Sequence, residues 1–124
     1  MPKNSLEDIK YLVEQDAWVY ATRSCAKEVL ELGLTQEQAK NIILALRPQP
    51  LREGGDFEKE WKGKATTDFG DIDADVYYIW FNEEEQRRCR PYMGQRFYVK
   101  LGIHTDVDGD VCLVVSLHLE NRPA

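Results

Sequence analysis

The chain has 124 residues and a formal net charge of −6, with 43% hydrophobic and 31% charged residues. This length and balance predict one soluble globular domain, residues 1–124, built around a single core. The acidic total argues against a protein that coats nucleic acid through its overall field. Since no apolar run approaches a membrane span and the first residues lack a signal-peptide core, we expect a cytoplasmic protein without a membrane partner.

Neither the cysteines nor the aspartates predict a metal site. The three cysteines, Cys25, Cys89 and Cys112, show no CxxC spacing, so neither a zinc site nor a disulfide framework is expected. The aspartate-rich stretches 71–75 and 106–110 lack the glycine and glutamate spacing of a calcium-binding EF-hand loop. We therefore interpret both stretches as turns with solvated charges, and we expect no metal and no cofactor.

The first half of the chain predicts three amphipathic helices, each opened by a Ser or Thr cap. They are expected from Ser5 to about Gln15, from Thr22 or Ser24 to Gly33, and from Thr35, with a capping box to Gln38, to the prolines at 48 and 50. Between the first two helices, Trp18 and Tyr20 alternate with smaller side chains and indicate an extended segment.

The second half of the chain predicts strands. Residues 57–65 form a short basic segment that fits a strand or a turn, and residues 66–74 are expected to be irregular. Residues 74–81 form a β-branched and aromatic run typical of a strand, and residues 82–95 form a long polar connection. Helices followed by strands predict an α+β fold with N-terminal helices packed on a C-terminal antiparallel β-sheet.

The most regular patterning lies in two alternating strands, Arg96–His104 and Val111–Leu119. Odd-numbered positions carry the apolar side chains in both strands, which predicts one buried face. A three-residue hairpin loop at 107–109 would then place Asp106 opposite Asp110.

This register predicts a polar cluster on the face opposite the core. Tyr98 would oppose His118, and Lys100 would oppose Ser116, at about 5 Å between Cβ atoms. An imidazole can act as general acid or base, a lysine can stabilise a phosphorane-like transition state, and a tyrosine can orient or donate. These are the demands of RNA cleavage by the 2′-hydroxyl, although an exposed sheet face with ordinary polar residues accounts for the same pattern.

Several motifs together resemble the MqsR-type toxins, in order, from about Ile9 to His118. The similar stretches are Thr22-Arg23-Ser24, Glu31–Leu34, Asn41–Ile43 with Leu46, Asp56–Lys59, Asp75–Tyr77, Gly94-Gln95 with Tyr98–Lys100, and Leu113–Ser116. The resemblance implies a RelE-like fold and a toxin of a type II toxin–antitoxin pair. It also implies a metal-independent endoribonuclease, or mRNA interferase, that cleaves mRNA and is neutralised by a cognate antitoxin protein.

The resemblance also implies site residues. The family's active-site lysine after Asp-Phe falls on Lys59, and its tyrosine in the penultimate strand falls on Tyr98. The family's C-terminal lysine falls on His118, which can perform acid–base chemistry directly, and its glutamine before Asp-Val-Tyr falls on Ala74. We therefore expect Lys59, Tyr98 and His118 to be catalytic.

Basic residues around these positions are predicted to bind RNA. Between residues 86 and 100 five side chains are basic and none is acidic, a pattern that a solvated loop would also show. The predicted contacts are Lys62, Lys64, Arg87, Arg88, Arg90, Arg96 and Lys100. Two other functions remain open: a RelE-like protein-binding module without catalysis, and a small acid–base enzyme acting on a metabolite.

Overall fold

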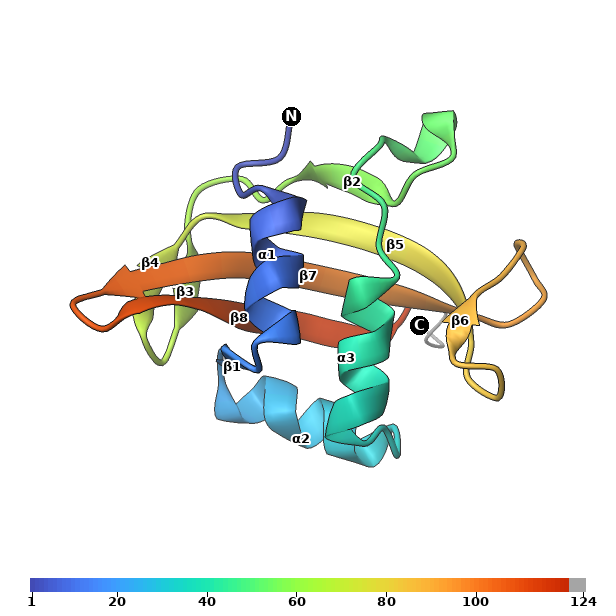
Figure 1. Ribbon diagram of the computed structural model, residues 1–124, viewed down its shortest axis with the longest axis horizontal. Helices are drawn as coiled ribbons and strands as arrows, with labels where there is room; N and C mark the ends of the chain where they lie inside the picture. Colours follow the sequence, from blue (N-terminus) through green and yellow to red (C-terminus); the bar gives the residue numbers. More distant parts are fainter. Residues whose placement is uncertain (121–124) are drawn as a thin grey trace.

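Three helices lie on one face of a curled, mostly antiparallel β-sheet in the computed structural model, which describes residues 1–120 (Figure 1). This arrangement confirms the predicted α+β class. Within the described residues, no helix has the length and apolar content needed to cross a membrane.

The helices begin where side-chain caps satisfy their first N–H groups. The Ser5 and Thr22 hydroxyls accept from Asp8 N and Cys25 N, and Thr35 and Gln38 form the predicted capping box. Thr22, rather than Ser24, is therefore the cap of the second helix. The helices are α1 (Leu6–Glu14), α2 (Arg23–Glu31) and α3 (Gln36–Leu44), and a 3₁₀ turn follows at Leu51–Glu53.

The main sheet has the strand order β1-β8-β7-β5-β2, with β6 pairing with the end of β5. Its strands are β1 (Trp18–Tyr20), β2 (Phe57–Glu60), β5 (Ala74–Asn82), β6 (Arg87–Arg88), β7 (Gln95–Asp106) and β8 (Gly109–Leu119). The C-terminal strands form the predicted antiparallel sheet, and the N-terminal strand β1 adds to its edge by pairing with β8 in parallel. Strand β1 lies in the connection between α1 and α2, so it precedes all the other strands in the sequence.

The prediction that residues 66–74 are irregular is wrong, because this stretch forms most of a small hairpin. Strands β3 (Ala65–Thr67) and β4 (Gly70–Ile72) pair with each other and not with the main sheet. The Thr67 hydroxyl donates to Gly70 O at 2.6 Å and accepts from Phe69 N at 3.0 Å, which closes the turn. In Figure 1 this hairpin lies at the same end of the sheet as the β7–β8 turn.

The helices and one face of the sheet enclose the main core. All three helices contribute buried side chains, and the central strands contribute aromatic and branched ones. The fully buried members include Ile9, Val13, Ile42, Ile43, Tyr77, Ile79, Phe81, Phe97, Val99, Leu101 and Leu117. Alternation along the strands sends the remaining side chains to the other face, called here the far face.

The register between β7 and β8 differs from the predicted one in two places that cancel. The turn has two residues, so Asp106 opposes Gly109 instead of Asp110. A β-bulge at Val115 then restores the predicted pairing beyond it. Because the two shifts offset each other, Tyr98 opposes His118 as predicted.

Between the turn and the bulge the predicted faces of β8 are therefore reversed. Cys112 and Val114 are buried against the helices, whereas Leu113 lies in a second apolar cluster on the far face. Ala65 and Ile72 of the β3–β4 hairpin cover this cluster. Both faces of this half of β8 are buried, which is why its residues form a continuous apolar run.

Gly102 lets the hairpin lie directly on the sheet. A Cβ atom there would stand 2.4 Å from Asp73 O and 2.6 Å from Ile72 Cδ1. The hairpin thus covers only the half of the far face around Gly102, and the half around Tyr98 stays open.

Candidate functional site

Tyr98 and His118 form the centre of the open half of the far face. The two side chains are register partners, and their rings stack with centroids 4.8 Å apart and planes 7° apart. Lys100 and Ser116 pair in the next row of the same face. The predicted juxtaposition of these four side chains is confirmed.

The backbone orients the His118 ring. Its Nδ1 lies 3.1 Å from Leu119 O, and since a carbonyl oxygen only accepts, Nδ1 carries the proton in this contact. In the neutral imidazole Nε2 then holds a free lone pair. His118 is therefore arranged to take a proton through Nε2.

Tyr98 is held on its other side by Tyr78 of β5, whose ring meets it edge to face at 5.4 Å. Burial, and then the neighbouring Tyr78, raise the pKa of the Tyr98 phenol. The phenol consequently stays protonated near neutral pH and can donate a hydrogen bond.

Two lysines lie on either side of β5, in the row of side chains next to the stack. Lys59 of β2 and Lys100 of β7 are both register partners of Val76. The Lys100 ammonium lies 3.6 Å from the centroid of the Trp61 ring, and Lys59 lies 6.0 Å from it. Burial, and then the charge of Lys59, lower the pKa of Lys100. An anion bound here would relieve the repulsion between the two ammonium groups.

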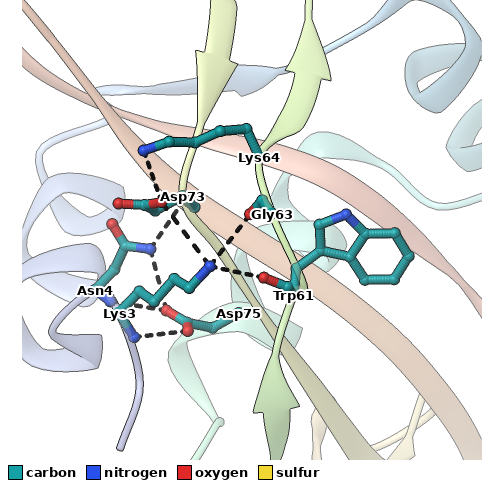
Figure 2. Close-up of polar contacts among 7 residues, drawn as sticks. All are labelled: Lys3, Asn4, Trp61, Gly63, Lys64, Asp73 and Asp75. Atoms are coloured by element: carbon teal, nitrogen blue, oxygen red, sulfur yellow. Dashed lines mark hydrogen bonds and ion pairs between the residues drawn. The ribbon is translucent and has the colours of Figure 1, made fainter.

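The N-terminal segment fixes the loop that carries Trp61 (Figure 2). The Lys3 ammonium donates to Trp61 O at 2.7 Å and to Gly63 O at 3.1 Å. Asp75, which is fully buried, accepts from Lys3 N at 2.7 Å and from Asn4 N at 2.8 Å. The indole of Trp61 points away from this cluster in Figure 2, so the polar contacts hold its backbone while leaving its ring beside Lys100.

Arg96 continues the site toward the other end of β7. Its guanidinium carbon lies 4.6 Å from the centroid of Tyr78, and its Nη1 lies 3.7 Å from Glu120 Oε1. Its register partner on β5 is Trp80. The open half of the far face is thus a row of aromatic rings interleaved with cations.

The other residues predicted to bind RNA lie around this surface and not within it. Arg88 is a structural residue, since it donates to buried Asp56 at 2.6 and 3.1 Å and to Ala45 O at 3.0 Å. Arg87 pairs with Glu85. The remaining residues, Lys62, Lys64 and Arg90, are exposed, and Lys64 pairs with Asp73 at 2.8 Å.

Sequence reasoning missed three aromatic members, Trp61, Tyr78 and Trp80. Tyr78 and Trp80 share the even-numbered parity of Tyr98, so alternation along β5 would have assigned them to the same face. Trp61 carries no such signal, because it follows β2 in a loop positioned by the N-terminal segment.

Ala74, which stands where the resembling family has a glutamine, lies outside the open half. It is fully buried in the apolar cluster beneath the β3–β4 hairpin, and its carbonyl accepts from Trp61 N at 2.9 Å. A longer polar side chain at this position would have to displace the hairpin.

Comparisons with protein-family models, curated proteins and solved structures found no match. Within residues 1–120, no group of three or more His, Cys, Asp or Glu side chains is placed to hold a metal ion.

Proposed function

We propose that this protein is an endoribonuclease that cleaves mRNA through the 2′-hydroxyl without a metal ion, and that it is the toxin of a type II toxin–antitoxin pair with a RelE-like fold. The observation that carries the proposal is the stack of Tyr98 on His118 beside Lys100, on the part of the sheet that neither the helices nor the hairpin cover. Support also comes from the resemblance of the sequence to MqsR-type toxins.

The proposed reaction uses the orientation of His118. Nε2 takes the proton of the 2′-hydroxyl, the 2′-oxygen attacks the adjacent phosphorus, and the bond from phosphorus to the 5′-oxygen breaks. The Tyr98 phenol gives a proton to the departing 5′-oxygen, while Lys59 and Lys100 stabilise the added negative charge on the phosphate. Water then returns a proton to Tyr98 and takes the one held by Nε2. The products are a 2′,3′-cyclic phosphate and a 5′-hydroxyl.

The surroundings of the stack fit a single-stranded substrate. Trp61, Tyr78 and Trp80 offer ring faces or edges for unpaired bases, and Arg96 adds a cation beside them. Stacking on aromatic rings combined with backbone charge contacts is how proteins bind single strands.

Part of the negative charge of the chain lies away from this surface. Six aspartates gather where the β3–β4 hairpin lies beside the β7–β8 turn (Figure 1): Asp68, Asp71, Asp73, Asp106, Asp108 and Asp110. A polyanion that approaches Lys59 and Lys100 therefore meets a local charge opposite in sign to the net charge, whereas the charge of Arg96 is offset by Glu120.

The direct test is cleavage of a single-stranded RNA by purified protein in EDTA. We expect the wild type to release a cyclic phosphate product, His118→Ala to lose about 10²-fold or more in rate, and Tyr98→Phe to be slower. Lys27→Ala, at an exposed position on α2, is the matched control for a general loss of charge. Equal rates in His118→Ala and wild type would contradict the assignment.

We also propose that the protein acts in the cytoplasm and that its partner is a cognate antitoxin protein. Expression should arrest growth, and co-expression of an adjacent antitoxin-like reading frame should relieve the arrest. Harmless overexpression would instead favour a RelE-like binding module without catalysis. Turnover of a small metabolite, with no affinity for RNA, would favour a metabolic acid–base enzyme.

A further inference from the structure

A pocket of about 330 Å³ opens beside the candidate cleavage centre. Tyr78, Trp80 and Arg96 of the sheet line one side, and the loop after β6 lines the other with Cys89 and Pro91. Its volume is at the lower end of the range for small-molecule sites, which suits one planar ring system better than a larger ligand.

The remaining wall is held in place by contacts within the protein. It is formed by residues 51–56, which the bidentate contact of Asp56 with Arg88 ties to β6. Gly55 is packed so closely that a Cβ atom there would stand 1.9 Å from Gln49 O. A preformed wall reduces the ordering cost of binding.

One of the residues that line the pocket, Arg96, carries a donor without a partner in the described part of the chain. Arg96 Nε is buried, and within residues 1–120 no acceptor is in hydrogen-bond reach of it. A buried unpaired N–H is costly, and a ligand acceptor in the pocket would remove that cost.

The charges around the pocket are already balanced. Asp56 neutralises Arg88, and Glu120 Oε1 lies 3.7 Å from Arg96 Nη1. A phosphate would bring further negative charge next to both carboxylates, whereas a neutral heterocycle would not. Together with the rings of Tyr78 and Trp80, this balance favours a nucleobase over a phosphate.

The pocket is also adjacent to the stack. Tyr78, which lines it, is in edge contact with Tyr98 at 5.4 Å. Tyr92, in the same loop as Pro91, lies against Trp80 at 4.8 Å between centroids. Its φ of 67° is unusual for a side chain of this size. The loop after β6 is thus organised around the aromatic side of the pocket.

We propose that this pocket binds one nucleobase of the RNA strand, next to the phosphate held at Tyr98 and His118, with an acceptor atom of the base taking the Arg96 Nε hydrogen bond. The inference rests on the proposed RNA substrate. It adds a base-binding subsite that fixes which phosphate reaches His118.

The test uses binding, so that it does not depend on cleavage. His118→Ala protein is titrated with each of the four ribonucleoside 5′-monophosphates and, separately, with ribose 5-phosphate, while NMR follows the Trp80 indole N–H. At least one nucleotide should shift this signal and slow alkylation of Cys89 by iodoacetamide. Ribose 5-phosphate should do neither, because it lacks the base.

Variants identify the pocket. Arg96→Met, which removes every donor of the side chain, should weaken nucleotide binding about tenfold or more. Arg23→Met, a change of an exposed arginine on α2, should leave it unchanged. Arg96→Lys retains a positive charge but loses the Nε donor, so it should bind as weakly as Arg96→Met; full binding by Arg96→Lys would overturn the role of Nε.

The inference is overturned if no nucleotide shifts Trp80, or if ribose 5-phosphate shifts it equally. Failure of the proposed function gives a different result, namely a wild-type protein that does not cleave RNA while nucleotides still bind the pocket.

Discussion

Tyr98 and His118 stack face to face across β7 and β8, with their centroids 4.8 Å apart. The ring and the hydroxyl of Tyr98 can therefore be tested separately. Tyr98→Phe keeps the ring contact and removes the donor, so we expect kcat to fall about 10²-fold with little change in KM. Tyr98→Ala also removes the support of the imidazole and should be slower still. Equal rates for wild type and Tyr98→Phe would show that the phenol only positions His118.

Lys100 predicts a pH dependence for RNA binding. Its pKa is lowered from 10.5 by burial and by Lys59, so it begins to lose its proton below the usual lysine range. A bound phosphate favours the charged form and raises this pKa again. Binding at an alkaline pH below the usual pKa of lysine should therefore take up protons, and affinity should fall as the pH rises further.

Calorimetry in two buffers of different ionisation enthalpy measures this uptake, with His118→Ala protein to prevent cleavage. Lys100→Met should abolish the uptake, and Lys62→Met, at an exposed site, should not. Proton release on binding would contradict the assignment.

The contact between Asp56 and Arg88 predicts a loss of stability. Asp56 is buried and accepts from Arg47 N at 2.6 Å as well as from both Arg88 nitrogens. Asp56→Ala leaves the Arg88 guanidinium without its partner and should lower the free energy of unfolding by about 3 kcal/mol. Glu85→Ala, which removes the exposed partner of Arg87, should change it by less than about 0.5 kcal/mol. Urea denaturation measures both, and equal effects would contradict a structural role for the pair.

We expect the protein to become more stable when the Tyr77 hydroxyl is removed. Its hydroxyl is buried and has no hydrogen-bond partner in the part of the chain that the structure describes, and burial raises its pKa. Tyr77→Phe removes an unpaired polar group while retaining the ring, so the free energy of unfolding should rise by about 1 kcal/mol. Tyr11→Phe, at an exposed position on α1, is the control. A destabilised Tyr77→Phe protein would show that the hydroxyl is bonded in solution.

Local sequence signals predicted the elements whose cause is local. Ser5 and Thr35 identify their helices because a cap needs only a side chain and an N–H group nearby. Alternation likewise identified β7 and most of β8. The parallel pairing of β1 and the contact of Asp56 with Arg88, 32 residues away, depend on tertiary packing and have no local signal.

The candidate site was predicted for partly fortuitous reasons. A loop one residue too long and an unforeseen bulge at Val115 offset each other, so that Tyr98 and His118 met as expected. Cys112 and Leu113 lie on the faces opposite to those predicted, because odd or even numbering alone cannot account for a shift in register. The continuous apolar run from Val111 to Val115 was the available signal for burial on both faces.

Val115 also determines which changes in chain length the sheet can accept. Lys100 pairs with Ser116 and Leu101 with Val114, so the bulged residue lies outside the ladder. A chain lacking Val115 would keep every partner and every side-chain direction on both sides of the gap. Removing Val115 would also lessen the local twist of β8. The curvature of the surface around His118 can therefore be altered without changing any residue that lines it.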